Sequence, residues 1–180
     1  MMKQEASFIH TSDLHLNGEK NRFNVFSRIV SLCIKRKVTG LIIAGDLFDE
    51  EANKSTINEA YIQFNRLDKK QIKVYLIKGD EDAKVKLSKL PVNVKLLRNN
   101  DVLSINGYKI GLFHGLSEDI KSRAKVDYLA LGHFHDFTKV NSRIYYSGSP
   151  IPSLKYKINP RYVMSVKFDG KRTKPIRIKL

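Results

Sequence analysis

Five apolar runs in this sequence end in an aspartate or a histidine, usually beside a glycine. The clearest is the run at residues 41–44, Leu-Ile-Ile-Ala, which leads directly into Gly45 and Asp46. A short apolar run bounded by glycine predicts a fully buried strand, and Gly45 lets the backbone turn without a clash from a Cβ atom. Asp46 is therefore predicted at the carboxyl end of a buried strand, where open α/β sheets place their binding sites.

Four further apolar runs deliver polar side chains in the same way. They end at Asp13 and His15, at Asp80, at His114, and at His133 and His135. The two pairs are spaced two residues apart, which puts both side chains of a pair on one face of an extended segment. A single strand-end Asp or His is usually a turn residue or a satisfied core group. Five such ends indicate a shared ligand, because burying many unpaired polar groups costs stability.

The first half of the chain predicts an α/β unit. Strands are predicted at residues 6–11, 41–44 and 72–77, and they alternate with a helix at 21–37 and a second helix capped by Ser55. This order predicts right-handed βαβ connections and a parallel sheet. His10, one residue before the end of the first strand, is predicted to be a structural core histidine.

The second half predicts mostly antiparallel structure. Hairpin turns are predicted at residues 106–107, 141–142 and 169–170, with a short helix at 118–124 and a strand at 128–131. Two packed β-sheets flanked by helices, a four-layer αββα sandwich, accommodate both halves. We expect one domain over residues 1–180, with a C-terminal hairpin at about 160–180 completing a sheet.

Composition narrows the class of partner. The formal net charge is +15, from 33 basic and 18 acidic residues, which favours anionic partners, nucleic acid first. An evenly spread solubility charge is the alternative. Cys33 is the only cysteine, so an intrachain disulfide and a Cys-rich zinc site are excluded. No apolar run approaches the roughly 20 residues of a membrane span, so we expect no membrane association and a cytoplasmic setting.

The motifs, taken together, resemble those of the calcineurin-like metallophosphoesterases. They read His-Thr-Ser-Asp-Leu-His-Leu at residues 10–16, Gly-Asp-Leu-Phe-Asp at 45–49, Phe-His-Gly at 113–115, Gly-His-Phe-His at 132–135 and Tyr-Ser-Gly-Ser-Pro at 146–150. Within that superfamily they are most similar to the SbcD-type DNA-repair nucleases. The resemblance covers about residues 8–150 and is highly specific for the superfamily, though less so for the nuclease branch.

The resemblance implies a binuclear metal site. Asp13, His15 and His135 would hold one ion, Asp80, His114 and His133 a second, and Asp46 would bridge the two. Asp46, Asp80, Glu81 and His114 are then the catalytic candidates. Manganese is expected, with iron, zinc or nickel as alternatives, since mixed imidazole and carboxylate ligands suit such metals. The implied reaction is hydrolysis of a phosphodiester, with DNA or RNA as the expected substrate.

The third motif departs from the family pattern. The family ordinarily reads Gly-Asn-His-Asp, whereas this chain has Gly-Asp-Glu-Asp at residues 79–82. Asp80 would still coordinate a metal, but its charge weakens the positive field that attracts a phosphate. Glu81 replaces a histidine thought to stabilise or protonate the departing oxygen, and an ionised glutamate would repel the phosphoryl group. We therefore expect a metal-loaded site with weak or unusual hydrolysis.

The sequence is also consistent with two other functions. A small-molecule phosphodiesterase and a non-catalytic metal-binding interaction module are the alternatives to a nuclease. Lys155, Lys157 and Arg161, interleaved with tyrosines, are candidates for contacts to phosphates and bases. Only about thirty residues follow Pro150, so a DNA-contacting cap and the segment that would dock an SbcC-like ATPase partner are expected to be absent.

Overall fold

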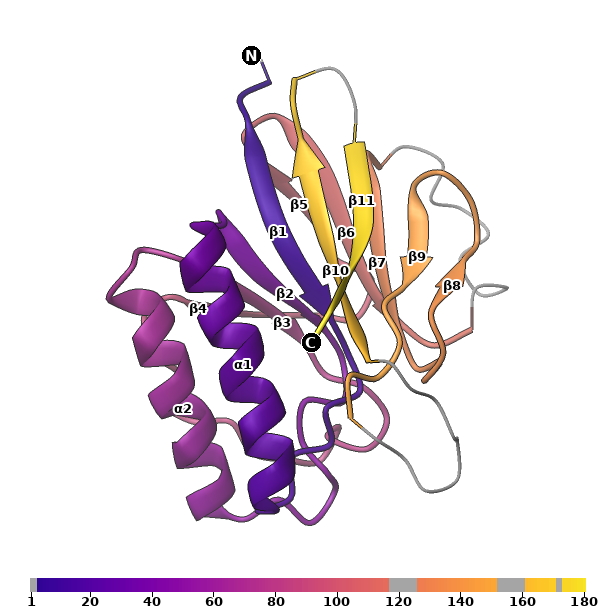
Figure 1. Cartoon of the computed structure of the whole chain (residues 1–180). Coiled ribbons are helices and arrows are strands. Elements are labelled where there is room, and N and C mark those ends of the chain that lie inside the picture. Colours follow the sequence, from indigo (N-terminus) through magenta and orange to yellow (C-terminus); the bar gives the residue numbers. More distant parts are fainter. Residues whose placement is uncertain (1–2, 117–125, 152–160, 171–172) are drawn as a thin grey trace.

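The computed structural model describes residues 3–116, 126–151, 161–170 and 173–180. Within these residues the chain forms two mixed β-sheets and two helices, as Figure 1 shows. The predicted α/β architecture of two packed sheets is confirmed. The helix expected at residues 118–124 and the candidates Lys155 and Lys157 lie outside the described residues.

The first sheet contains six strands within the described part of the chain, in the order β11-β10-β1-β2-β3-β4. Its strands are β1 (Ala6–Thr11), β2 (Gly40–Ala44), β3 (Lys73–Ile77), β4 (Val94–Leu97), β10 (Tyr162–Phe168) and β11 (Thr173–Lys179). The first four are parallel to one another, and the β10–β11 hairpin adds antiparallel strands beside β1. The parallel half matches the βαβ prediction.

The second sheet contains five strands among the described residues, in the order β5-β6-β7-β9-β8. They are β5 (Val102–Ile105), β6 (Tyr108–His114), β7 (Tyr128–Gly132), β8 (Thr138–Lys139) and β9 (Ile144–Tyr146). The β5–β6 and β8–β9 hairpins are antiparallel, but β6, β7 and β9 run parallel to one another. The expectation of a mostly antiparallel second half missed this parallel centre, because turn signals identify hairpins but not how hairpins pair with other strands.

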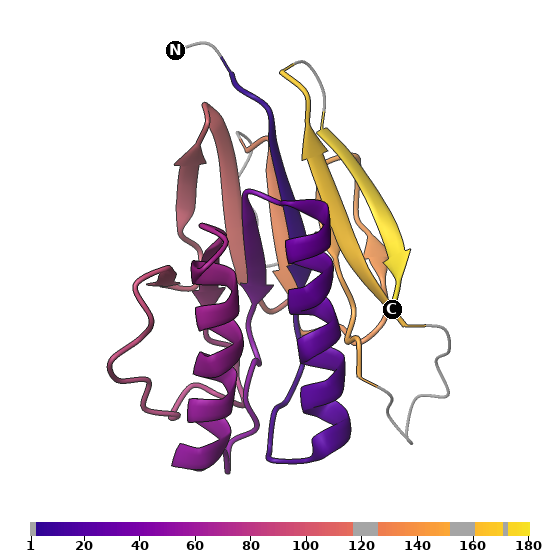
Figure 2. The ribbon, with the colours of Figure 1, turned by 60° about the vertical axis from the view of Figure 1, so that its left-hand side comes forward.

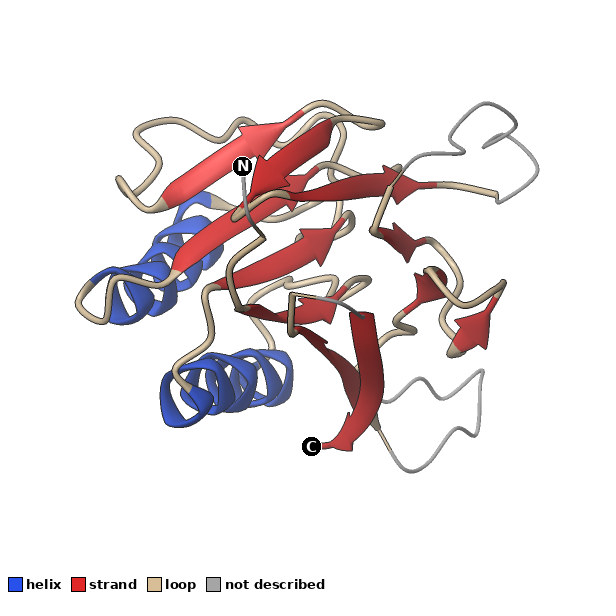
Figure 3. Cartoon of the chain, turned by 90° about the horizontal axis from the view of Figure 1, so that it is seen from above, coloured by secondary structure: helices blue, strands red, loops and turns tan. Residues whose placement is uncertain are grey.

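Both described helices cover the first sheet. Helix α1 (Lys20–Arg36) and helix α2 (Lys54–Asp68) lie side by side (Figure 2) and together on one side of the strands (Figure 3). Helix α1 buries Phe23, Phe26, Val30 and Cys33, the predicted apolar stripe. None of the described helices is long and apolar enough to cross a membrane.

One local prediction was wrong, and one strand was missed. Helix α2 is capped by Asn53, whose side chain accepts a hydrogen bond from the Thr56 N–H, and Ser55 lies inside the first turn. Strand β4 was not predicted, because its side chains are exposed or half-buried and show no apolar alternation. Strand β4 is held by backbone pairing with β3. The buried amide of Asn93, just before the strand, donates hydrogen bonds to the carbonyls of Phe64 and Ile72.

The core between the sheets contains His10 and Tyr128. Phe8, Ile42, Ile110 and other apolar side chains fill this layer. His10 Nδ1 lies 2.9 Å from the Tyr128 hydroxyl, so a polar contact joins β1 to β7 within the apolar layer. Burial lowers the pKa of His10 to about 3, although a backbone hydrogen bond to Leu131 opposes the shift. His10 therefore stays neutral in the folded protein, as a structural core histidine would.

His10→Asn is expected to flatten the dependence of stability on acid pH. An unfolded histidine takes up a proton below pH 6.5, while folded His10 does so only near pH 3. Stability is therefore intact above pH 6.5 and falls as the pH drops between these values. The loss from pH 6.5 to pH 5 is about 2 kcal/mol at about 1.4 kcal/mol per pH unit.

Denaturant unfolding of both proteins at pH 7 and pH 5 measures this effect. Asparagine keeps a polar atom near the position of Nδ1 and does not titrate, so it is the matched replacement. Equal losses in the two proteins would contradict a buried neutral His10.

Candidate metal centre

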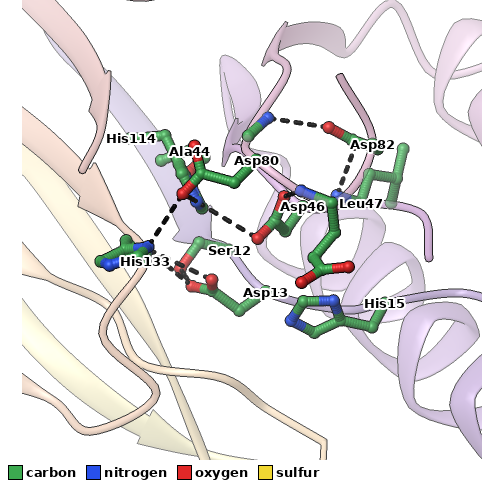
Figure 4. A network of polar contacts seen from close by, with 12 residues as sticks. Ser12, Asp13, His15, Ala44, Asp46, Leu47, Asp80, Asp82, His114 and His133 are labelled. Carbon is green, nitrogen blue, oxygen red and sulfur yellow. Dashed lines mark hydrogen bonds and ion pairs between the residues drawn. The ribbon is translucent and has the colours of Figure 1, made fainter. Parts of the chain in front are cut away.

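The carboxyl ends of five strands converge on one edge of the molecule. Strand β1 leads to Asp13 and His15, and β2 to Asp46; β3 leads to Asp80, β6 ends at His114, and β7 leads to His133 and His135. The parallel direction of β6 and β7 is what brings the polar ends of the second sheet to those of the first. Figure 4 shows six of these side chains pointing toward one another.

The structure brings together all seven residues that the resemblance implied as ligands. In one group, single ligand atoms of Asp13, His15 and His135 all lie within 4.8 Å of one another. A second group of the same size contains Asp80, His114 and His133, and a third contains Asp13, Asp46 and His114. The third group joins the other two through shared residues. We call these seven residues the strand-end cluster.

Asp46 and His114 lie at the middle of the strand-end cluster. His114 Nε2 is 3.2 Å from Asp46 Oδ2 and 3.8 Å from Asp80 Oδ2. Burial alone would lower the pKa of His114, but the hydrogen bond and charge of Asp46 outweigh it and raise this pKa to about 9. Burial alone would likewise raise the pKa of Asp46, and His114 holds it below its usual value. Each residue therefore stabilises the charged form of the other.

Asp13 is a fully buried carboxylate. It accepts hydrogen bonds from the Ser12 hydroxyl and, at 3.2 Å, from the His133 N–H. Burial raises the pKa of Asp13 to about 7, although the hydrogen bond from Ser12 opposes the shift. The Ser149 hydroxyl donates to the Asp13 carbonyl at 2.7 Å, so the loop after β9 positions this residue without touching its carboxylate. A buried carboxylate of this kind gains stability from a cationic partner.

The donor set fits divalent transition metals. His114 Nε2 is buried and faces the carboxylates of Asp46 and Asp80, whereas its Nδ1 lies 2.9 Å from the Ala44 carbonyl. Burial lowers the pKa values of His15 and His135, which favours the neutral imidazole that a metal requires. The rings of these two histidines approach at Nε2 to 3.4 Å. Two imidazoles and a buried carboxylate suit manganese, iron or zinc.

The second group is open to solvent at Asp80 and His133, whereas His114 is buried. The Asp80 side chain is 71% exposed and its Oδ2 lies 3.2 Å from His133 Nδ1. Glu81 is exposed, and its main-chain N–H donates to Asp46 Oδ1 at 3.0 Å. A ligand can therefore reach this side of the cluster, past Asp80 and Glu81, while Asp13 and Asp46 lie beneath.

Glycines let the two sheets meet closely at the cluster. A Cβ atom on Gly132 would collide with the Ala44 carbonyl oxygen and would lie 2.9 Å from His114 Nδ1. Gly45 has a φ of +92°, and a Cβ atom there would collide with the His114 ring. The glycines beside the strand-end residues therefore allow the two sheets to approach each other closely, and they also allow the chain to turn.

Gly132→Ala is expected to destabilise the protein by about 1–3 kcal/mol and to weaken metal binding, because a backbone carbonyl cannot move aside for the new methyl group. Gly111→Ala is the matched control in neighbouring strand β6, where a Cβ atom would meet the flexible end of the Leu129 side chain. Thermal unfolding and metal titration of both variants measure the difference. A smaller effect at Gly132 than at Gly111 would contradict the close approach.

Four residues of the strand-end cluster have left-handed backbones. Asp13, His15, Asp46 and His133 have φ values of 54°, 46°, 48° and 101°. Aspartate and histidine are among the non-glycine residues enriched in this region, and such conformations persist where the surroundings fix them. The turns after β1, β2 and β7 therefore aim these side chains inward at some cost in backbone energy.

Two supporting residues were not assigned from the sequence. Asp82, fully buried, accepts hydrogen bonds from the N–H groups of Gly79, Leu47 and Phe48, so one carboxylate joins the loops after β2 and β3. Asn99 forms two 2.9 Å hydrogen bonds with the main chain of His114. Asp82 stands in the third motif, where it could have been singled out, but Asn99 follows the unpredicted strand β4 and gives no such signal.

Arg161 is the described member of the three basic candidates. Its guanidinium donates to the Ser149 carbonyl at 3.4 Å, on the loop that also supports Asp13. Burial lowers the pKa of Arg161, and the charge of Asp136 opposes this shift. This cation therefore lies beside the segment that carries His135, and its role in phosphate binding remains a prediction.

Comparison with known proteins defines the family. The family model described as "Calcineurin-like phosphoesterase" matches residues 6–150. This chain therefore belongs to the calcineurin-like phosphoesterases, as the motifs indicated.

One curated relative carries a function in its name. The chain is 30% identical over 122 residues to the DNA double-strand break repair protein Mre11 of Sulfurisphaera tokodaii. That alignment covers 59% of this chain and 31% of the relative, so the chain spans about a third of the relative's length.

Two solved structures share the fold. An archaeal phosphodiesterase superposes with a TM-score of 0.68 at 15% identity, covering 96% of this chain and 99% of that one. A nuclease MPE from Pseudomonas putida superposes with a TM-score of 0.53 at 17% identity, covering 94% of this chain and 87% of that one. At these low sequence identities, the similarity establishes a shared fold and nothing about activity.

Proposed function

We propose that this protein is a binuclear metal-dependent phosphodiesterase that acts on nucleic acid. The observation that carries the proposal is the strand-end cluster. It contains two groups of three donors, each compact enough for one ion, and a third group of Asp13, Asp46 and His114 that joins them. Membership of a phosphoesterase family makes hydrolysis of a phosphate ester the natural use of such a centre.

The proposed ligand assignment follows the two groups. Asp13, His15 and His135 hold one ion, and Asp80, His114 and His133 hold the other, with Asp46 between them. When bound, a pair of divalent cations supplies Lewis-acid chemistry, by polarising a phosphoryl oxygen and making a water molecule acidic enough to act as nucleophile. Manganese is the proposed metal, and iron, zinc or nickel are alternatives.

The chain's own residues supply orientation and charge. The Ala44 carbonyl and Asn99 hold His114 so that its Nε2 faces Asp46 and Asp80. Asp13, Asp46 and Asp80 contribute three negative charges against the four positive charges of two divalent ions, which leaves a centre that still attracts an anionic diester. The exposed position of Asp80 makes its side of the cluster the entry for substrate.

Nucleic acid is the proposed substrate class. The formal charge of +15 favours a polyanion over a small diester, and the named relative is a DNA repair protein. Arg161, which hydrogen-bonds the Ser149 carbonyl and feels the charge of Asp136, is the described cation that we propose contacts a flanking phosphate. A compact diesterase for small molecules would need neither feature.

A parallel assay with manganese tests the proposal. Purified protein is given bis-p-nitrophenyl phosphate, p-nitrophenyl phosphate and single-stranded DNA, and the affinity for DNA is measured over a range of salt concentrations. We expect cleavage of both diesters, little cleavage of the monoester, and DNA affinity that falls steeply with salt through counterion release.

Two outcomes would overturn the proposal in different ways. Cleavage of the small diester alone, with DNA binding that is weak at low salt, would place the protein among small-molecule phosphodiesterases. Failure to cleave any of the three by protein that has taken up metal would indicate a non-catalytic interaction module, a result that the Glu81 position would then explain.

A further inference from the structure

Phe134 is exposed to solvent and is not packed in the core. All nine phenylalanines of the chain lie in the described residues, and Phe134, with 39% of its surface accessible, is the only one of them that is exposed. It stands between His133 and His135, which belong to different groups of the strand-end cluster. An exposed phenyl ring at the rim of a metal centre has a solvation cost that a bound ligand would remove.

A pocket lies beside this ring. It has a volume of about 500 Å³ and is lined by His133, Phe134, His135, Asp136 and Thr138. That volume falls within the usual range for sites that bind small organic groups, roughly 300–1,000 Å³. Because two of the lining residues are also proposed metal ligands, a group in this pocket would lie next to a ligand held at the metal centre.

The Phe134 ring is supported from behind. Its centroid lies 4.5 Å from that of Tyr146, at an interplanar angle of 53°. Tyr146 is fully buried, and its hydroxyl donates to the Gly115 carbonyl at 2.9 Å. The Phe134 ring therefore packs at a tilt against a buried partner, and 39% of the residue's surface remains accessible to an outside contact.

The segment that carries the ring is also fixed. The Ser149 N–H donates to the His135 carbonyl at 3.0 Å, and Gly148 approaches Phe137 and His135 so closely that a Cβ atom there would meet their backbones. Strand β8 then pairs with β9, with Thr138 opposite Tyr146. The pocket wall therefore needs little ordering when a ligand binds, which favours affinity.

We propose that Phe134 forms a stacking subsite for a nucleobase of the substrate, next to the phosphate held at the metal centre. This inference rests on the proposed function and extends it by naming the group that is recognised. A nucleobase fits because it presents a flat π-face, and stacking on an aromatic side chain binds any base without reading its sequence. The linkage from phosphate to base would connect the centre with the pocket beside it.

Fluorescence of Phe134→Trp tests the subsite without relying on turnover. The chain contains no tryptophan, so the new indole reports from this position alone. A short single strand of deoxyadenosine is titrated in the presence of manganese, alongside an abasic strand of equal length and charge. We expect the strand with bases to quench the fluorescence and the abasic strand to leave it nearly unchanged. Ile176→Trp, on exposed strand β11, is the matched control and should respond to neither strand.

Cleavage kinetics give a second readout. Phe134→Ala should lower kcat/KM for the strand with bases by roughly 5- to 150-fold, the range expected for loss of one base stack. The same variant should lose less activity on the abasic strand than on the strand with bases, and Phe134→Tyr should restore the rate on the strand with bases. Thermal unfolding checks that Phe134→Ala remains folded.

The outcomes separate this inference from the proposed function. Quenching of the Phe134→Trp variant by the strand with bases, with no cleavage of any diester, would retain the subsite and reject the phosphodiesterase. Equal quenching by both strands, or equal kcat/KM values for wild type and Phe134→Ala on the strand with bases, would overturn the subsite while leaving the phosphodiesterase in place. A mononucleotide that quenches as well as the strand would support the subsite and assign its base to a small nucleotide ligand.

Discussion

Asp46→Asn is expected to reduce diesterase turnover by more than about 100-fold, beyond the 10- to 100-fold typical of changes around metal ligands. Asp46 is buried, its Oδ2 lies 3.2 Å from His114 Nε2, and it belongs to the group that joins the two others. Asparagine keeps an oxygen that can accept the Glu81 N–H but removes the charge. We therefore expect a folded protein that binds less than its full complement of manganese.

Metal content after dialysis and cleavage of bis-p-nitrophenyl phosphate, measured on the same samples, check this prediction. Asp68→Asn is the matched control, because it makes the same chemical change outside the strand-end cluster. Asp68 lies at the end of α2, before the start of β3, whereas the cluster lies at the carboxyl ends of the strands. An Asp46→Asn protein that keeps two metal ions and wild-type turnover would show that Asp46 is not a bridging ligand.

Asp80→Asn combined with Glu81→His is expected to raise turnover by about 10²- to 10⁴-fold, the usual contribution of a positioned general acid. The resemblance to the family implies an asparagine and a histidine at these positions. Asp80 Oδ2 lies 3.2 Å from His133 Nδ1, in the same donor group. The amide oxygen of asparagine can take the place of Oδ2 with one negative charge fewer. The Glu81 backbone is already anchored to Asp46, so a histidine there starts from a fixed main chain.

Each single variant separates the two contributions. Asp80→Asn alone should strengthen phosphate binding, whereas Glu81→His alone should raise the rate with leaving groups that need protonation. Glu51→His, an exposed histidine outside the strand-end cluster, controls for added imidazole. No gain in the double variant, in protein that still binds both metals, would contradict the account of weak hydrolysis.

The candidate site was more predictable than the arrangement of the second sheet. Asp13, Asp46 and Asp80 follow buried strands of a βαβ pattern, and parallel strands put their carboxyl ends at one edge, so local patterns were enough to group them. His114 and His133 required the parallel pairing of β6 with β7, which no local signal specifies. For those two histidines, the prediction that they join the aspartates came from the order of the motifs and the family resemblance. Hydrophobic periodicity alone does not predict it.

The misses have related physical causes. Ser55 has the chemistry of a helix cap, but Asn53 two residues earlier has it too, and the observed hydrogen bond to Thr56 decides between them. Strand β4 owes its place to backbone pairing with β3 rather than to apolar alternation. Asn99 acts through contacts with a strand end that is distant in sequence. Each depends on contacts that appear only in the folded chain.

The left-handed turns at Asp13, His15, Asp46 and His133 limit how this centre can change during evolution. Under the proposed ligand assignment, a replacement at any of them must both coordinate a cation and tolerate a positive φ. Among residues that coordinate cations, aspartate, asparagine and histidine are the ones enriched there. Softer thiolate donors or longer carboxylates would meet an added conformational penalty. Adaptation to another metal is therefore easier at Asp80, His114 and His135, whose φ values are not positive, than at the four constrained positions.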